Sequence, residues 1–235
     1  IPSGVLSRKL AMVLAAIGLL TTLILSFQFS AFFLLLILGY ALLQIWYSKQ
    51  LKHIPILDIS TIATGFLIRI YAGAVVVNLH MSVWFLLTVI SASLFLAVGK
   101  RQSERTLLQG NEDISVGETR KILTRYTERL LDQYTSMFGM ATWLTYALFA
   151  FQNEISPPER VSADIYTYLP KALHSQKLLM LTVPLVIFGV MRYLQLIYES
   201  NKGESPEKVL LQDKPLKYTV GLFGALVMII IYVLT

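Results

Sequence analysis

The sequence predicts an all-α integral membrane protein, built as a multi-helix transmembrane bundle with seven spans. Of the 235 residues, 55% are hydrophobic and only 14% are charged, and the mean hydropathy is +0.63. Soluble domains are about 25% charged, so an ordinary water-soluble enzyme is excluded. Lipid offers no hydrogen-bond partners, so spanning segments must be helices or a closed barrel. Uninterrupted apolar runs such as Phe32–Leu38 lack the alternation of a barrel strand.

Seven apolar segments are long enough to cross a hydrocarbon core of about 30 Å as helices. In chain order, these predicted spans are Leu10–Phe27, Ala31–Tyr47, Ile54–Val77, Ser82–Val98, Leu130–Phe151, Leu178–Tyr198 and Tyr218–Leu234. The first two carry no charge and are expected to face lipid or to pack against neighbouring helices. Residues Glu118–Asp132 are predicted to form an amphipathic helix that runs into the fifth span.

The positive charges follow the positive-inside rule for such a bundle. With Ile1 on the cytoplasmic side, fifteen of the 20 Lys and Arg residues fall in inside segments and three in outside segments. The remaining two, Arg69 and Arg192, lie within spans. The net charge of +6 is therefore explained by cytoplasmic loops, and no nucleic-acid partner is expected.

The third span carries polar residues along one face. Asp58 and Arg69 are eleven residues apart, about three helical turns, so they share a face but lie about 16 Å apart. They cannot pair with each other, and a charge at membrane depth costs at least about 2.5 kcal/mol on insertion scales. We therefore expect each to have another partner and this face to line a polar binding cavity. A role in helix packing is the alternative.

A first candidate phosphate-binding segment precedes this span. Tyr47 and Lys52 lie just before Asp58, and a lysine ammonium beside this carboxylate suits an anionic head group. Ordinary interfacial anchoring explains Tyr47 equally well.

A second candidate segment closes the fourth span and contains Lys100, Arg101, Glu104 and Arg105. If helical, it forms a cation-rich turn with one carboxylate. Such a turn can clamp a diphosphate while Glu104 orients a cation. Residues that only determine topology would look the same.

Three motifs in this order resemble those of the UbiA-type polyprenyl transferase superfamily. They are Tyr47-Ser48-x-x-Leu51-Lys52-x-x-Pro55-x-x-Asp58, then Gly65-Phe66-x-x-Arg69-x-x-Ala72-Gly73, then Gly99-Lys100-Arg101-x-x-Glu104. Within the superfamily, the chain is most similar to the transferases that move phosphoribose onto decaprenyl phosphate. The late motif Gly203-x-x-Pro206-Glu207-x-x-Leu210-x-x-Asp213 also resembles that group. The resemblance covers most of the chain.

The resemblance implies nine transmembrane helices around a cytoplasm-facing cavity, of which the seven spans are the third to ninth. Residues 1–235 would then form a single domain that lacks its first two helices. It also implies Mg²⁺ held by an aspartate-rich motif of the NDxxDxxxD type, followed in relatives by a segment like Ile1-Pro2-Ser3-Gly4. We therefore expect the metal ligands to precede Ile1.

Family likeness and charge together imply the substrates. Relatives with a prenyl diphosphate donor carry a second aspartate-rich motif where this chain has Lys100-Arg101-Gln102-Ser103-Glu104. The difference favours a phosphoribosyl diphosphate donor and a polyprenyl phosphate acceptor, used at the cytoplasmic face of a bacterial inner membrane. The expected catalytic residues are Asp58, Lys100 and Arg101, and the expected substrate-binding residues are Tyr47, Lys52, Arg69, Glu104 and Asp213.

Two other functions fit the sequence. An ordinary UbiA-type enzyme would use a prenyl diphosphate donor and an aromatic acceptor. A non-enzymatic carrier or membrane subunit would need the charges only for topology and packing.

Overall fold

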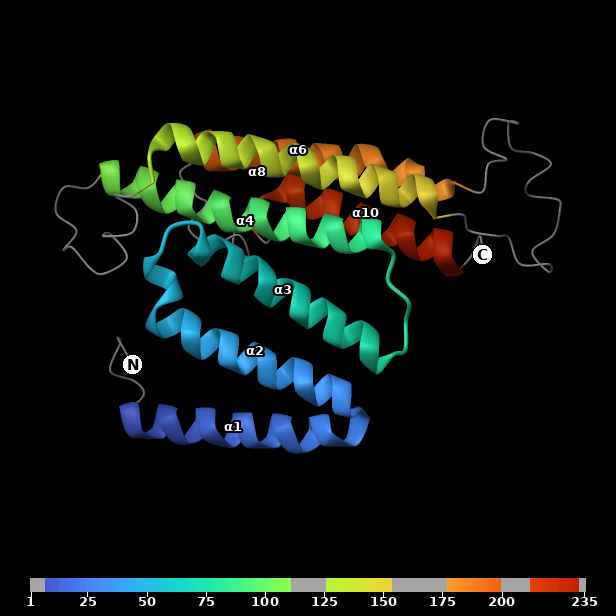
Figure 1. Cartoon of the computed structure of the whole chain (residues 1–235). Coiled ribbons are helices and arrows are strands. Elements are labelled where there is room, and N and C mark those ends of the chain that lie inside the picture. Colours follow the sequence, from blue (N-terminus) through green and yellow to red (C-terminus); the bar gives the residue numbers. More distant parts are fainter. Residues whose placement is uncertain (1–6, 111–125, 154–176, 200–211, 233–235) are drawn as a thin grey trace.

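The computed structural model describes residues 7–110, 126–153, 177–199 and 212–232, and all regular structure in these ranges is helical (Figure 1). The predicted all-α bundle is thereby confirmed. The helices are α1 (Arg8–Phe29), α2 (Ala31–Lys49), η1 (Leu51–His53), α3 (Leu57–Val76), α4 (Val83–Gly110), α6 (Glu128–Gln152), η3 (Leu178–Thr182), α8 (Val183–Glu199) and α10 (Lys214–Tyr232), where η marks a 3-10 helix.

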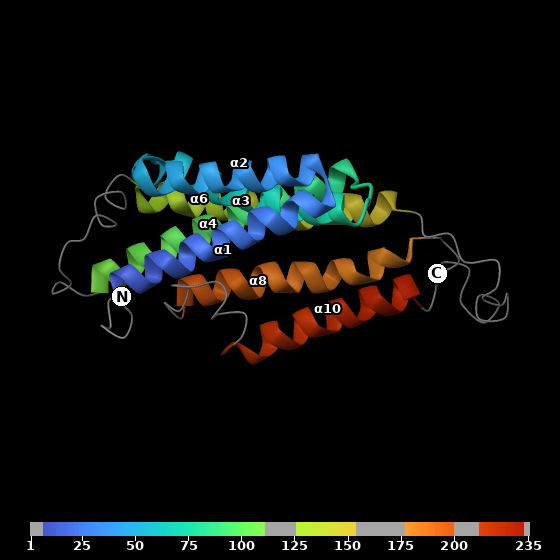
Figure 2. The ribbon, with the colours of Figure 1, turned by 90° about the horizontal axis from the view of Figure 1, so that it is seen from below.

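The long helices run roughly alongside one another. In the view of Figure 1, one group of α1, α2 and α3 lies below a second group of α4, α6, α8 and α10, and Figure 2 shows α8 and α10 set to one side of α2, α3, α4 and α6. Helices α1, α2 and α3 follow one another as antiparallel neighbours, and α3 packs against α4 of the second group, which also contains α6, α8 and α10. Buried side chains form three clusters. The first lies between α3, α4 and α6, the second between α4, α8 and α10, and the third around α6, η3 and α10.

Six helices in the described ranges are long and apolar enough to cross a membrane. They correspond to six of the seven predicted spans. The exception is the fifth, Leu130–Phe151, which forms within the 25-residue helix α6 but is more polar than the others. Asp132 and several threonines lie along it, and Thr135, Thr142 and Thr145 bond their hydroxyls to carbonyls of their own helix. In α1 and α2 only 6% and 0% of the spanning window is buried, so their apolar side chains are available to lipid.

The third predicted span begins later than expected. The prediction placed its start at Ile54, whereas α3 starts at Leu57 after η1 and a turn at Pro55. Pro55 has no backbone N–H to donate, and Ile56 has a φ of 71°, which interrupts the helix. The predicted amphipathic helix 118–132 lies partly outside the described residues, and α6 itself starts at Glu128.

Gly99 permits a close approach between α4 and α8. A Cβ added there would lie 2.7 Å from Cδ1 of Ile197 and 2.9 Å from Cε1 of Tyr193, both on α8. Real side chains do not tolerate such contacts without a shift. The glycine of the third sequence motif therefore has a packing reason, and it brings α8 against the helix that carries Lys100 and Arg101.

Candidate functional site

Except for Arg69, which lies in the middle of α3, the charged residues singled out by the sequence lie at one end of the bundle, which we call the mouth end. There α2 ends, α3 begins, α4 ends, α6 begins, α8 ends and α10 begins (Figure 1). Segments far apart in sequence therefore bring their polar side chains to the same level.

Asp58 and Arg101 form a buried ion pair at the mouth end. Asp58 lies in the first turn of α3, where the helix dipole favours negative charge, and it is fully buried. Nε of Arg101 donates to Oδ2 of Asp58 at 2.9 Å, and Nη1 donates to Oε2 of Glu104 at 2.5 Å. Nη2 lies 3.5 Å from the hydroxyl of Tyr47 on α2. Four of the eight predicted site residues thus meet around one guanidinium.

This arrangement refines the predicted cation-rich turn. The turn is helical as expected, but the charge of Arg101 is matched by two carboxylates, Asp58 and Glu104. Lys100 is half-buried, and no carboxylate of the described residues lies within ion-pair distance of it. Lys52 is half-buried in η1. Any net positive charge of the site therefore depends on Lys100 more than on Arg101.

Tyr126 completes the cluster, and sequence reasoning missed it. It is 1% exposed, its hydroxyl donates to Oδ1 of Asp58 at 2.6 Å, and the same hydroxyl accepts from the N–H of Ile56 at 2.6 Å. Burial, and then the hydrogen bond to Asp58, raise the pKa of Tyr126 well above its usual range. Arg105 donates to the carbonyl oxygen of Tyr126. A single tyrosine in a charged stretch gives no periodic signal that would have identified it.

A second polar network adjoins the first. On α4, Nε2 of Gln102 donates to Oδ1 of Asp132 at 3.0 Å, and the hydroxyl of Tyr198 donates to the same oxygen at 2.8 Å. These contacts join α4, α6 and α8. The sequence reasoning had not selected these three residues, whose connection exists only in the folded bundle.

Asp213 pairs with Arg192 of α8 and is not among the partners of Arg101. Its carboxylate receives two hydrogen bonds from Arg192 of α8, at 3.1 and 2.8 Å, and its Oδ2 accepts from the N–H of Leu216 at 3.0 Å. Asp213 therefore caps the start of α10 and ties it to α8, which gives Arg192 its partner. Substrate binding by Asp213, predicted from the motif, stays a prediction beside this structural role.

Arg69 lies apart from the cluster. Its Nε donates to the carbonyl of Gly65 at 3.2 Å, and its guanidinium lies 4.5 Å from the Phe66 ring centroid and 5.6 Å from that of Tyr40. It borders a cavity of about 730 Å³ between α1, α2 and α3. As predicted, Arg69 and Asp58 do not pair with each other.

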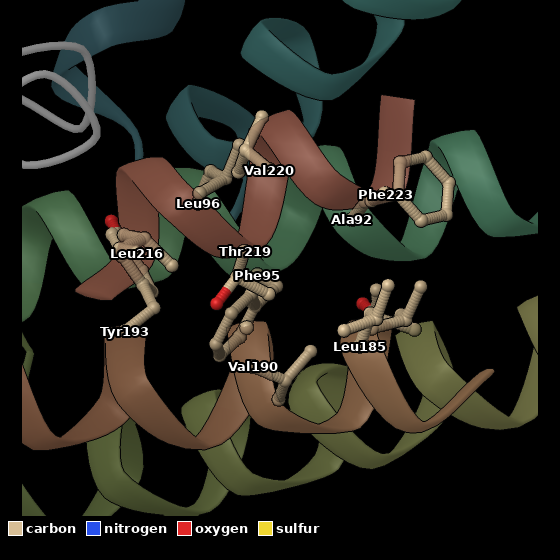
Figure 3. A pocket seen from close by; sticks show the side chains of 13 residues that line it. Ala92, Phe95, Leu96, Leu185, Val190, Tyr193, Leu216, Thr219, Val220 and Phe223 are labelled. Atoms are coloured by element: carbon tan, nitrogen blue, oxygen red, sulfur yellow. The ribbon is translucent and has the colours of Figure 1, made fainter. Parts of the chain in front are cut away.

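An apolar pocket of about 290 Å³ lies between α4, α8 and α10, with Thr142 of α6 also in its wall (Figure 3). Phe95 and Leu96 of α4 form one side, Val190 and Tyr193 of α8 another, and residues 216–223 of α10 cover it. Its lining is almost entirely hydrocarbon, which suits an apolar chain rather than a phosphate.

The described residues do not provide a site for Mg²⁺. No group of three or more His, Asp or Glu side chains within the described ranges could hold a metal ion. Both oxygens of Asp58 already accept hydrogen bonds, and Oε2 of Glu104 is bonded to Arg101. An aspartate-rich motif before Ile1, which the family resemblance implies, stays a prediction.

Comparison with proteins of known function identifies relatives along nearly the whole chain. It is 30% identical over 231 residues to decaprenyl-phosphate phosphoribosyltransferase of Mycolicibacterium smegmatis, which covers 96% of this chain and 68% of that protein. It is 31% identical over 178 residues to the protein of the same name from Corynebacterium glutamicum, covering 76% of this chain and 48% of that protein. No family model matches the chain.

A solved structure shares the fold. The structure of a UbiA homolog from Archaeoglobus fulgidus bound to Cd²⁺ superimposes with a TM-score of 0.63 at 16% identity. The match covers 97% of this chain and 75% of that one. At this identity the likeness concerns the arrangement of helices.

Proposed function

We propose that this chain, which belongs to the UbiA-type transferase family that includes decaprenyl-phosphate phosphoribosyltransferase, transfers a 5-phosphoribosyl group. The donor would be phosphoribosyl diphosphate and the acceptor a polyprenyl phosphate. The observation that carries the proposal is the 30% identity to a transferase of that name along 96% of the chain. The chain spans about half the length of the Corynebacterium relative, so the activity is proposed for the whole protein.

In the proposed reaction, a phosphate oxygen of the acceptor attacks the anomeric carbon of the donor. The bond from that carbon to the diphosphate breaks, and its electron pair leaves with the diphosphate. The acceptor phosphate is already ionised near neutral pH, so it needs little help from a base. Lys100 and Lys52 would bind the diphosphate, whose charge grows as the bond breaks, and Arg101 would donate hydrogen bonds to it.

The positions of Lys100 and the apolar pocket suit an amphiphilic acceptor. Leu96 lines the pocket, and Lys100 lies one helical turn further along the same face of α4. An acceptor phosphate beside a donor bound at Lys100 would therefore place the first part of a polyprenyl chain among Leu96, Val190 and Val220 (Figure 3). Soluble phosphates would gain nothing from such a pocket.

The mouth end is proposed to face the cytoplasm of a bacterial inner membrane. Lys49, Lys100, Lys214 and Lys217 all belong to this end, and cytoplasmic ends of membrane helices collect Lys and Arg. Phosphoribosyl diphosphate is water-soluble, so it would enter from this side. We also propose a dependence on Mg²⁺, held by residues other than those described, and the single domain would include the helices expected before Ile1.

The test is a transfer assay on the full-length protein in lipid with Mg²⁺. One reaction contains phosphoribosyl diphosphate and polyprenyl phosphate, another contains prenyl diphosphate and hydroxybenzoate, and a third repeats the first with a chelator. We expect a phosphoribosylated lipid in the first reaction only. Product only in the second would establish an aromatic prenyltransferase instead, and product in none would favour a carrier.

Two variants test the residues. Lys100→Ala should raise the KM for phosphoribosyl diphosphate, whereas Lys49→Ala, an exposed lysine on α2, should not. Gly189→Leu fills the pocket, because Gly189 lines it and a Cβ there meets nothing within 4 Å. It should raise the KM for long-chain but not short-chain polyprenyl phosphates, with Gly221→Leu on α10 as the matched control. Unchanged kinetics for Lys100→Ala would contradict its assignment.

A further inference from the structure

We propose that Tyr126 is a positioning residue for the transfer reaction: it fixes the Asp58 carboxylate and, through it, the Arg101 guanidinium at the mouth end. This role deepens the proposed function and rests on it for its kinetic consequences. Tyr126 does not belong to any of the motifs that resemble the family, and its role follows from its contacts alone.

The first contact secures a buried charge. Asp58 is fully buried, and each of its oxygens accepts one hydrogen bond, Oδ2 from Arg101 at 2.9 Å and Oδ1 from Tyr126 at 2.6 Å. A buried carboxylate needs such donors, because it has lost its water. With only Arg101 as a donor, the carboxylate could rotate about its last bond, so Tyr126 sets the plane in which Arg101 must lie.

The second contact holds a strained turn. Ile56 has a φ of 71°, a conformation that is costly for a β-branched residue, and its N–H donates to the Tyr126 hydroxyl at 2.6 Å. Asp58 follows two residues later in the first turn of α3. Tyr126 therefore fixes both the backbone that carries Asp58 and the carboxylate itself.

A third contact fixes Tyr126 to α4. Arg105 donates to the Tyr126 carbonyl oxygen, and Arg105 lies one turn beyond Arg101 on the same helix. The path Arg105–Tyr126–Asp58–Arg101 thus starts and ends on α4. A closed set of contacts of this kind holds the Arg101 guanidinium in one orientation relative to its own helix.

The orientation matters because two of the five N–H groups of Arg101 have no hydrogen-bond partner among the described residues. Three of its five N–H groups are directed at Asp58, Glu104 and Tyr47. The remaining N–H groups of this buried arginine can hydrogen-bond to the diphosphate of phosphoribosyl diphosphate only if the guanidinium plane is fixed. Tyr126 would therefore act on donor binding through Asp58 and Arg101, without touching substrate.

The kinetic test uses Tyr126→Phe in the full-length protein. We expect the KM for phosphoribosyl diphosphate to rise about tenfold, as for a lost hydrogen bond to a charged group, while the KM for polyprenyl phosphate is unchanged. A merely structural loss would lower the active fraction and move neither KM. Tyr218→Phe, a 73% exposed tyrosine on α10, is the matched control and should behave as wild type.

A double-mutant cycle of Tyr126 and Asp58 separates an effect that acts through Asp58 from direct contact of Tyr126 with the substrate. If Tyr126 acts through Asp58, Tyr126→Phe should leave the donor KM unchanged in an Asp58→Ala background. An equal rise in both backgrounds, or no rise in the wild-type background, would overturn the proposal. Should Asp58→Ala not fold, Asp58→Asn replaces it, and the rise should then shrink instead of vanishing.

The same cycle is also measured as melting temperatures without substrate, so that it does not depend on the transfer reaction. We expect Tyr126→Phe to lower the melting temperature less in the Asp58 variant than in wild type. Fully additive shifts would overturn the positioning role, even if the protein proves to catalyse another transfer. Absence of phosphoribosyl transfer with non-additive shifts would instead refute the proposed function and leave the geometry standing.

Discussion

Replacing either partner of the Asp58–Arg101 pair should lower the free energy of unfolding, and the decrease should differ between the two replacements. Breaking a buried pair by removing one partner typically costs about 3–5 kcal/mol, because the remaining charge is left buried and unmatched. Asp58→Asn leaves Arg101 paired with Glu104, whose side chain is 20% exposed. Arg101→Gln leaves two carboxylates, Asp58 at 0% and Glu104 at 20% exposure, with no cation between them.

We therefore expect the free energy of unfolding to fall by about 3 kcal/mol for Asp58→Asn and by about 5 kcal/mol for Arg101→Gln. For a chain of this size, about 2–4 °C of melting temperature corresponds to each kcal/mol, so the shifts should be about 6–12 °C and about 10–20 °C. The assay is thermal unfolding of the full-length protein in detergent, followed by loss of helical circular dichroism.

Lys49→Gln is the control for this comparison, because it removes an exposed cation of α2 from the same end of the bundle. Its melting temperature should lie within about 2 °C of wild type. A shift for Arg101→Gln equal to or smaller than that for Asp58→Asn would refute the reasoning, since Glu104 would then not share the charge of Arg101.

Three further predictions concern packing, capping and pH. Gly99→Ala should destabilise by about 1–3 kcal/mol in a thermal assay, because its Cβ would press into α8, whereas Gly221→Ala, with open space around it, should be neutral or stabilising. Asp213→Ala should cost more than Asp213→Asn, by about 1 kcal/mol, because asparagine can still cap α10 after the ion pair with Arg192 is lost. The pKa of Tyr126 is raised in the folded state, so its protonated hydroxyl stabilises the folded protein fully below the unfolded-state pKa of about 10. This stabilisation should be lost as the pH rises from there through the folded-state pKa. The difference in melting temperature between wild type and Tyr126→Phe, measured against pH, should therefore be constant below about 10 and narrow above it.

The helices of this fold could be predicted because membrane spans are encoded locally. A run of apolar residues long enough to cross the bilayer is sufficient, and six predicted spans correspond to helices of that kind. The fifth span shows where local reasoning weakens. Its threonines hydrogen-bond to their own helix, so α6 forms at full length although its composition is more polar.

Pairing between helices was only partly predictable. The spacing of Asp58 and Arg69 required separate partners, and the structure agrees. The sequence also singled out Arg101, but as a catalytic residue that contacts the diphosphate. Nothing in a sequence separation of 43 residues indicates that Arg101 and Asp58 meet, because helix packing decides it. Tyr126 was missed for the same reason, since its role depends on where the chain enters α6.

The charge balance at the mouth end changes what its residues can do for an anionic donor. Asp58, Glu104 and Arg101 together carry one net negative charge, so this cluster cannot by itself attract a diphosphate. Long-range attraction must then come from the lysines around it, and Lys100 has no carboxylate of the described residues within ion-pair distance. Arg101 can still donate hydrogen bonds to a bound diphosphate, because the geometry of its N–H groups does not depend on the net charge of the cluster. Mutating the lysines should therefore make donor binding less sensitive to salt, whereas mutating Tyr126 should weaken it equally at all salt concentrations.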